Sequence, residues 1–163
     1  MFATYLQIPF ECALTSASAL EGSPLLQKLN ADEELDDWTI LAVFLAQNRY
    51  YKRMTAGGKQ DAGSLAQSSG LKREAAEAWA PYIYALPSRT GAVLEWTQVE
   101  LDSVRTTSAA VAAAEVTASA AAAWQQVEPM VKEAAPAMDV SPFAVTEETF
   151  RYILQRLHGC SRS

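Results

Sequence analysis

The chain has few of the residues from which catalytic and metal centres are built. Its 163 residues include a single histidine and two cysteines, Cys12 and Cys160, near opposite ends. Neither cysteine belongs to a CxxC pair or to a cluster of metal-ligating side chains, so no metal site is expected. A disulfide between the two is disfavoured, and an intracellular, reducing compartment fits the composition better. Cytoplasm, nucleus and plastid stay open.

Long apolar runs and an excess of positive charge are also missing. The most apolar window, residues 39–46, is far shorter than the roughly 18 to 20 residues of a membrane span. The N-terminus lacks the charged, apolar and small-residue order of a signal peptide. The net charge of −6 leaves no basic field for nucleic acid or an anionic membrane. We therefore expect neither nucleic acid nor a membrane among the partners.

No motif of reactive side chains stands out. The dipeptide Gly57-Gly58 precedes a lysine, but Gln60 stands where a phosphate loop needs serine or threonine. His158 lies near the end of the last predicted helix, where a cation is mildly favourable, and we assign it a structural role. From chemistry alone we predict no catalytic residue, no cofactor-binding residue and no metal ligand.

Helical periodicity is what the sequence has instead. One stripe of large side chains repeats at helical spacing: Trp79, Tyr82, Ile83 and Leu86. Pro87 ends this helix, because a proline disfavours helical geometry in the residue before it. A helix this short is not stable alone. We interpret the stripe mainly as core, packed against the flanking segments 32–54 and 97–132.

The longest regular pattern predicts a helix over residues 32–54. Asn30 and Glu33 have the spacing of a capping box that would open it. Its predicted inner face is Leu35, Trp38, Leu41, Ala42 and Leu45, and further apolar residues predict a middle covered on all sides. Cations at its end, namely Arg49, Lys52 and Arg53, complement the helix dipole. A binding patch there is the less favoured interpretation.

The remaining segments are less regular. Residues 55–70, rich in glycine and small polar side chains, predict a mobile loop. Thr97 and Glu100 form a second capping-box pattern. An alanine-rich helix is expected over residues 106–128, with Trp124 as its anchor, and Pro129 should break or kink it.

The two ends of the chain carry short patterns of their own. Residues 136–142 predict a linker, with Phe143 as a candidate core anchor. Thr146 is expected to cap a last helix with the inner face Phe150, Ile153, Leu154 and Leu157. Near the start, residues 4–8 alternate as in a single strand, whose partner strands are not evident in this chain. The predicted fold class is mainly α with a short N-terminal β element.

The order of several short sequence segments along the chain is more informative about the family than any one segment. The segments are Ile8-Pro9 with Leu14-Thr15, residues 38–45, residues 79–87, Trp96-Thr97 with Glu100-Leu101, and Phe150-Arg151-Tyr152. Together they resemble SET-domain protein methyltransferases of the Rubisco large-subunit lysine and actin-histidine methyltransferase group. The most specific segment is WAPYIYALP, which resembles the family pattern FWxPYLxxLP. The resemblance covers nearly the whole chain.

The resemblance implies part of a larger α+β fold. Residues 1–14 would be the first strand or strands of a SET domain, and residues 15–163 its inserted helical region. The complete family enzyme uses S-adenosylmethionine to methylate a side-chain nitrogen, usually lysine, of a protein substrate. The family's cofactor loop, Asn-His pair and active-site tyrosine have no counterpart here, and Gly159 and Cys160 occupy its Ser/Thr-Arg positions. We therefore expect this chain alone to be inactive.

For the matching residues the implied role is structural. The inserted lobe forms one wall of the substrate cleft, and Trp79, Pro81 and Tyr82 would lie in that wall. A second hypothesis is a non-enzymatic helical interaction module, in which the stripe meets a partner helix or peptide. Burial of Trp79 and Tyr82 would weaken the second hypothesis, and an open apolar groove around them would favour it.

Overall fold

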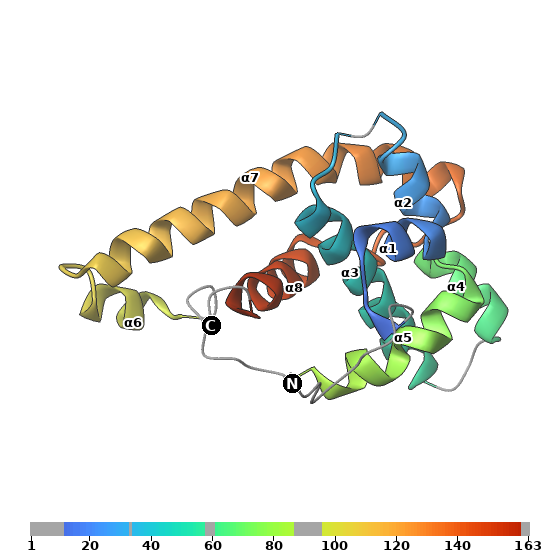
Figure 1. Cartoon of the computed structure of the whole chain (residues 1–163), viewed down its shortest axis with the longest axis horizontal. Helices are drawn as coiled ribbons and strands as arrows, with labels where there is room; N and C mark the ends of the chain where they lie inside the picture. Colours follow the sequence, from blue (N-terminus) through green and yellow to red (C-terminus); the bar gives the residue numbers. More distant parts are fainter. Residues whose placement is uncertain (1–11, 33, 58–60, 87–95, 161–163) are drawn as a thin grey trace, which may run out of the picture.

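The computed structural model describes residues 12–32, 34–57, 61–86 and 96–160, the side chains of residues 155, 156 and 158–160 excepted. These residues form α1 (Ser16–Gly22), α2 (Pro24–Leu29), α3 (Asp37–Thr55), α4 (Ala62–Ser69), α5 (Arg73–Ala85), α6 (Gln98–Ser103), α7 (Ser108–Ala137) and α8 (Glu147–Cys160) (Figure 1). The predicted mainly α class is confirmed. The predicted strand, residues 4–8, lies outside the described residues.

Helix α3 is the central element of the fold. It packs against α1, α2, α4, α5 and α8, and every residue from Ala42 to Asn48 is buried. Such a run fits a helix surrounded by neighbours, since an amphipathic surface helix would expose one side. The predicted coverage on all sides is therefore confirmed. Trp38, predicted on the inner face, is 40% exposed.

The start of α3 differs from the prediction. The helix begins at Asp37, and Asp36 caps it by accepting hydrogen bonds from the Thr39 amide at 3.0 Å and the Thr39 hydroxyl at 2.7 Å. Asn30 instead ends α2, and its side-chain oxygen accepts from the amide of Leu35 at 3.1 Å. The prediction that Asn30 opens this helix with a capping box was therefore wrong. Asn30 and Asp36 are both possible caps within seven residues, and Asp36 is the one whose side chain accepts from an amide in the first turn of α3.

The loop predicted over residues 55–70 was wrong for half of its length, since α4 lies within it. Asp61 caps α4, and its Leu65 and Ala66 are buried. Gly70 ends the helix at φ +76°, a left-handed conformation that glycine adopts without strain. Burial of two apolar residues thus stabilises a helix that the small, polar composition of this segment does not predict.

A buried polar network ties α4 to the body. The Gln47 side chain of α3 donates to the Ser69 carbonyl at 2.8 Å and accepts from the Ser23 hydroxyl at 2.9 Å. That hydroxyl also lies 3.0 Å from the carbonyl of Gly70. A Cβ on Gly70 would stand 2.6 Å from Gln47 Nε2, so glycine is needed for close packing as well as for its dihedral angle.

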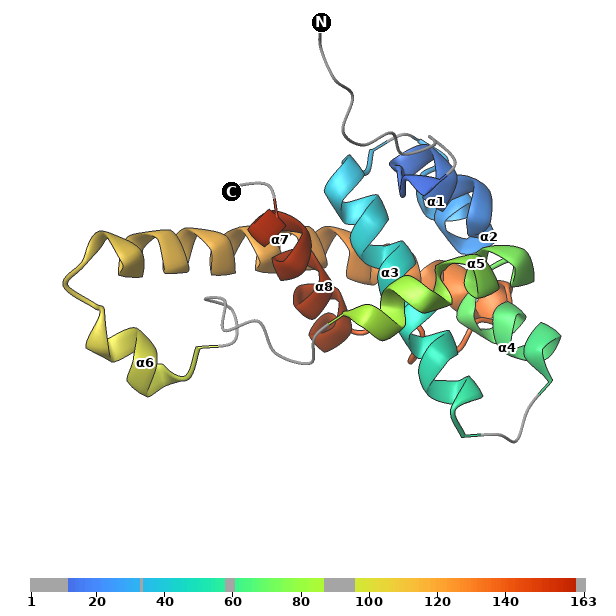
Figure 2. The ribbon, with the colours of Figure 1, turned by 60° about the horizontal axis from the view of Figure 1, so that its bottom comes forward.

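Helix α7 has two dissimilar halves (Figures 1 and 2). We call α6 together with residues 108–119 of α7 the arm; the two views show the arm extending away from the other helices. Of residues 98–119, Ala113 alone is buried, whereas the later part of α7 buries a series of side chains: Ala120, Trp124, Val127, Val131, Ala134 and Ala135. Capping of α6 by Thr97 and Glu100 is confirmed.

Proline does not end α7. The helix continues through Pro129 and Pro136 to Ala137, so the expected break at Pro129 was wrong, and the linker expected over residues 136–142 begins two residues later, at Met138. Pro129 is exposed, and so is Gln125, whose carbonyl loses its partner and can bond to water instead. Burial of Val127 and Val131 on either side offsets this loss. Phe143 is 69% exposed and does not anchor the core.

Helix α8 closes the body between α3 and α7. Its predicted cap is confirmed, since the Thr146 hydroxyl accepts from the amide of Thr149 at 3.3 Å. The predicted inner face is also confirmed: Phe150, Ile153 and Leu154 are buried, and Leu157 is partly buried against the core. The Phe150 ring packs 5.5 Å from that of Trp124, so the expected anchor of α7 meets α8.

Candidate functional site

The aromatic stripe of α5 divides between core and solvent. Ile83 is buried at 3% exposure, and Trp79 and Leu86 pack partly buried against the core. Pro81 and Tyr82 are exposed, Tyr82 at 42%, and its ring meets that of Trp79 edge-on at 6.4 Å. The three residues predicted for a cleft wall thus lie close together on α5, with Trp79 turned toward the body and the other two toward solvent.

A cleft opens where the C-terminal ends of α3 and α5 meet α8. Its volume is about 300 Å³, and we call it the basic cleft; it is lined by Arg49, Lys52, Arg53, Ala56, Ile83, Leu86 and Tyr152. The three cations come from one face of α3, because residues spaced by three and four lie side by side on a helix. The apolar wall comes from the end of the aromatic stripe.

Arg49 is held at the inner wall of the basic cleft. Its guanidinium carbon lies 3.5 Å from the centre of the Tyr152 ring, a cation–π contact between α3 and α8. The Nη1 atom is buried and has no hydrogen-bond acceptor among the described residues. The contact with the ring restrains the guanidinium, and Nη1 is the donor left without an acceptor in the described part of the chain.

Lys52 is fixed by two contacts with α5. Its ammonium donates to the carbonyl of Ile83 at 3.1 Å and lies 4.1 Å from the centre of the Tyr84 ring. The Ile83 carbonyl belongs to the last turn of α5, where carbonyls lack helical partners and a cation is favoured. Lys52 therefore closes the end of α5 and keeps its charge beside the basic cleft.

The cations of the basic cleft form no ion pair with a carboxylate of the described residues. The ion pairs between described residues are Arg73–Glu77, Lys132–Glu128 and Arg151–Glu147, each within one helix. None of them includes a cation of the basic cleft. Within the described part of the chain, Arg49, Lys52 and Arg53 thus form a group of cations without a carboxylate partner.

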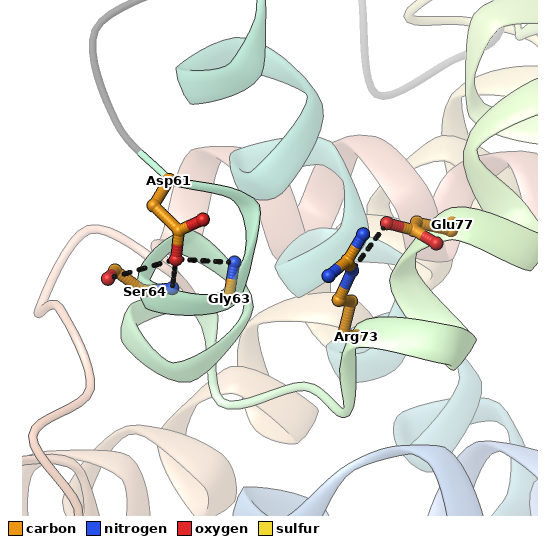
Figure 3. Close-up of polar contacts among 5 residues, drawn as sticks. All are labelled: Asp61, Gly63, Ser64, Arg73 and Glu77. Atoms are coloured by element: carbon orange, nitrogen blue, oxygen red, sulfur yellow. Dashed lines mark hydrogen bonds and ion pairs between the residues drawn. The ribbon is translucent and has the colours of Figure 1, made fainter.

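A second polar group lies at the other end of α5 (Figure 3). One carboxylate oxygen of Asp61 accepts from the amides of Gly63 at 3.1 Å and Ser64 at 3.2 Å, and Arg73 Nε pairs with Glu77 at 2.8 Å. The hydrogen bond and charge of Glu77 raise the pKa of Arg73. These contacts cap α4 and support one turn of α5, so their role is structural.

Tyr51 of α3 lies within the electrostatic influence of this second group. Burial, more than any charge, raises the pKa of its hydroxyl, and Glu77 and Asp61 raise it further while Arg73 lowers it. The side chain is 5% exposed. A phenol whose ionised form is disfavoured is not prepared to act as a base, and we assign Tyr51 to the core.

A pocket of about 500 Å³ lies between α7 and the segment that leads to α8. Trp124, Val131 and Val145 are among the apolar residues that line it. The charged residues at its edge include Glu128 and Lys132, which pair with each other at 2.8 Å. No set of convergent, unsatisfied polar groups marks this pocket, so the basic cleft remains the better candidate.

The described residues contain no group of three or more metal-ligating side chains. None of the described helices combines the length and apolar character needed to cross a bilayer. The sequence marked the basic cleft only by cations at positions 49, 52 and 53. Tyr152, about a hundred residues later, could not be assigned to it without the tertiary structure.

Comparisons of the chain with protein-family models, with curated proteins and with solved structures give no match.

Proposed function

We propose that this chain is the helical, substrate-facing lobe of a SET-domain protein methyltransferase of the Rubisco large-subunit lysine and actin-histidine methyltransferase group. The observation that carries the proposal is the convergence of three segments with the family resemblance. Residues 38–45 lie on α3, residues 79–85 on α5 and residues 150–152 on α8, and α3 packs directly against both other helices. Two of the segments reach the basic cleft through Ile83 and Tyr152, and residues 38–45 lie in the largely buried part of α3 that carries both neighbouring helices.

The lobe would bind and orient a protein substrate, and would take no part in the chemical step. The parent reaction transfers the methyl group of S-adenosylmethionine to a side-chain nitrogen, and holding that nitrogen in line supplies much of the rate. No residue of this chain is assigned a catalytic or cofactor role. Pro81 and Tyr82 are exposed at the surface that would face the substrate, and Trp79 supports Tyr82 from beneath.

The first test is titration of the chain with S-adenosylmethionine by calorimetry. We expect no binding heat, because the family's cofactor-binding residues have no counterpart among these residues. Micromolar affinity would contradict the assignment of the chain to a substrate lobe without cofactor function. A positive control is any intact protein methyltransferase under the same buffer conditions.

The second test is the sequence of the transcript on either side of this reading frame. The proposal expects an Asn-His pair and a later tyrosine downstream and in frame, and a glycine-containing loop upstream. A complete transcript without these motifs would remove the methyltransferase proposal.

A non-enzymatic interaction module is the second candidate. It is favoured by the exposure of Tyr82 at 42% and Tyr84 at 60%, beside a basic cleft whose charge no described carboxylate balances. Such a module would bind its partner with the same affinity whether or not S-adenosylmethionine and the remaining parts of an enzyme are present. A partner that binds only in the presence of those parts would exclude it.

A further inference from the structure

The basic cleft is lined by a half-buried arginine, Arg49, with one buried donor, Nη1, that has no acceptor among the described residues. A guanidinium has five N–H donors and no acceptor, and Nη1 of Arg49 finds no partner among the described residues. Leaving a buried donor unsatisfied is costly, and more so when the group is charged. Because Nη1 itself is enclosed, an anionic ligand in the basic cleft would meet the other donors of the half-buried Arg49 side chain.

We infer that the basic cleft binds a carboxylate from an acidic segment of a protein partner. The guanidinium carbon of Arg49 lies 3.5 Å from the centre of the Tyr152 ring, and the edge of a guanidinium can meet both oxygens of one carboxylate. Lys52 is held beside it by the Ile83 carbonyl and keeps further N–H donors for the ligand. Arg53, exposed at the rim, adds a third positive charge.

The position of the basic cleft favours a carboxylate over a phosphate. It lies at the C-terminal ends of α3 and α5, where helix dipoles place partial negative charge. A dianionic phosphate is usually held by amides at a helix N-terminus, and the lining residues include no such terminus. A carboxylate carries one negative charge, so the two helix dipoles oppose it less than they oppose a dianionic phosphate, while the three cations still attract it.

The surroundings of the basic cleft favour a peptide over a polyanion. The chain carries a net charge of −6, so the three cations form a local positive site within an acidic protein. Nucleic acid and membrane surfaces need a wider basic field. Ile83, Leu86 and Ala56 supply an apolar wall, and a volume of about 300 Å³ has room for an acidic side chain beside an apolar one. That the ligand belongs to a protein rests on the proposed function; the carboxylate chemistry does not.

The test uses the full chain and two peptides that differ in one group. The probe is acetyl-Ala-Leu-Glu-Leu-Ala-amide, and its control replaces the glutamate with glutamine. Binding is followed by NMR through the arginine Nε–Hε signals, with that of Arg49 identified by its loss in Arg49→Lys. We expect the glutamate peptide to shift the Arg49 signal saturably and to bind at least about tenfold more tightly than the glutamine peptide. Added salt should lower the affinity for the glutamate peptide, because it screens the charges.

Variants of the cations locate the site. Arg49→Gln should lower the affinity for the glutamate peptide by about tenfold or more. Arg49→Lys should lower it by less, because lysine keeps the charge but not the planar guanidinium. Arg53→Gln removes an exposed side chain, leaves the fold unchanged and should still cost about two- to threefold through lost rim charge. The matched control is Arg73→Gln at the far end of α5, which should have no effect. Circular dichroism checks the fold of each variant.

Three results would overturn the inference: equal binding of the two peptides, an unchanged affinity in both Arg49→Gln and Arg53→Gln, or tighter binding of a phosphoserine peptide of the same design. The last would assign the cleft to phosphate. None of these experiments includes S-adenosylmethionine, so their failure leaves the proposed methyltransferase role to its own tests. Conversely, absence of the family motifs from the transcript would leave carboxylate binding intact and remove only the substrate role of the peptide.

Discussion

The middle of α3 and the arm are both helical, but for different physical reasons. Every residue from Ala42 to Asn48 is buried among neighbouring helices, whereas Ala113 alone is buried among residues 98–119 of the arm. Packing therefore holds α3, although it contains β-branched and polar residues. The arm helix has eight alanine or valine residues between positions 109 and 119 and little to pack against, so it relies on the high helix propensity of alanine. Substitutions should distinguish these two causes.

The largest effect is expected from truncating the core beneath α3. Phe44 is fully buried, and Phe44→Ala should lower the free energy of unfolding by about 3–5 kcal/mol through lost burial and a residual cavity. Urea denaturation followed by circular dichroism measures it. The matched control is Phe143→Ala, where the ring is 69% exposed, with an expected change below about 0.5 kcal/mol. Equal losses at the two sites would contradict the assignment of the core.

The next effect concerns the buried polar network. Gln47→Ala leaves the Ser69 carbonyl without its side-chain donor, at a cost of about 1–3 kcal/mol for the unsatisfied group, and the Ser23 hydroxyl keeps the Gly70 carbonyl as its acceptor. Gln126→Ala is the control, because its amide also donates to a carbonyl, that of Glu34 at 3.3 Å, but in an exposed position. Its loss should be at most a few tenths of a kcal/mol. Denaturation midpoints at equal m-values compare the two.

A smaller and local effect is expected in the arm. Ala118 is exposed, and Ala118→Gly should weaken the local helix by about 1 kcal/mol through backbone entropy. Amide hydrogen exchange should rise about fivefold over residues 108–119, while the urea midpoint of the body stays unchanged. A matching drop in the global midpoint would show that the arm and the body unfold together, and would remove the contrast between them.

The smallest effect is a pH dependence linked to Tyr51. Its pKa is raised from the ordinary value of 10.0, first by burial and then by Glu77 and Asp61, so the folded protein holds this proton more tightly than the unfolded chain. The resulting stabilisation is fully present below pH 10 and is lost as the pH rises through the folded-state pKa. Absorbance titration of tyrosinate, with Tyr51→Phe to identify the signal, measures this pKa. Glu77→Gln should move it back toward 10.0; a pKa at or below 10.0 in the parent protein would contradict the burial.

Much of the fold could be predicted because burial leaves a periodic trace in the sequence. The apolar spacing of Phe150, Ile153 and Leu154 marked the inner face of α8, and the run around Phe44 marked a helix surrounded by others. Errors occurred where several local signals compete. Asn30 and Asp36 are both acceptable caps, and only the packing of Leu35 and Ile40 selects the second. Helix α4 was missed because its stability comes from neighbours and not from its own composition.

The candidate site was predicted only in part. Helical spacing alone places Arg49, Lys52 and Arg53 on one face, and dipole complementarity explains that charge without any ligand. The distinguishing facts are that Tyr152 covers Arg49 and that Nη1 is buried without an acceptor among the described residues. Both depend on contacts between residues far apart in the chain. Pro81 and Tyr82 were expected in a cleft wall; they lie exposed on α5 and do not line the basic cleft, and substrate contact there remains a prediction.

The sequence by itself determined that this chain is mainly helical, which helix faces are apolar and where positive charge gathers, because these properties follow from residue type and local spacing. The tertiary structure alone decided which caps are used, that α7 continues past its prolines, and that the cations at the end of α3 face Tyr152 and the end of α5. Those outcomes depend on the free energy of long-range packing, which outweighs local preferences of about 1 kcal/mol each.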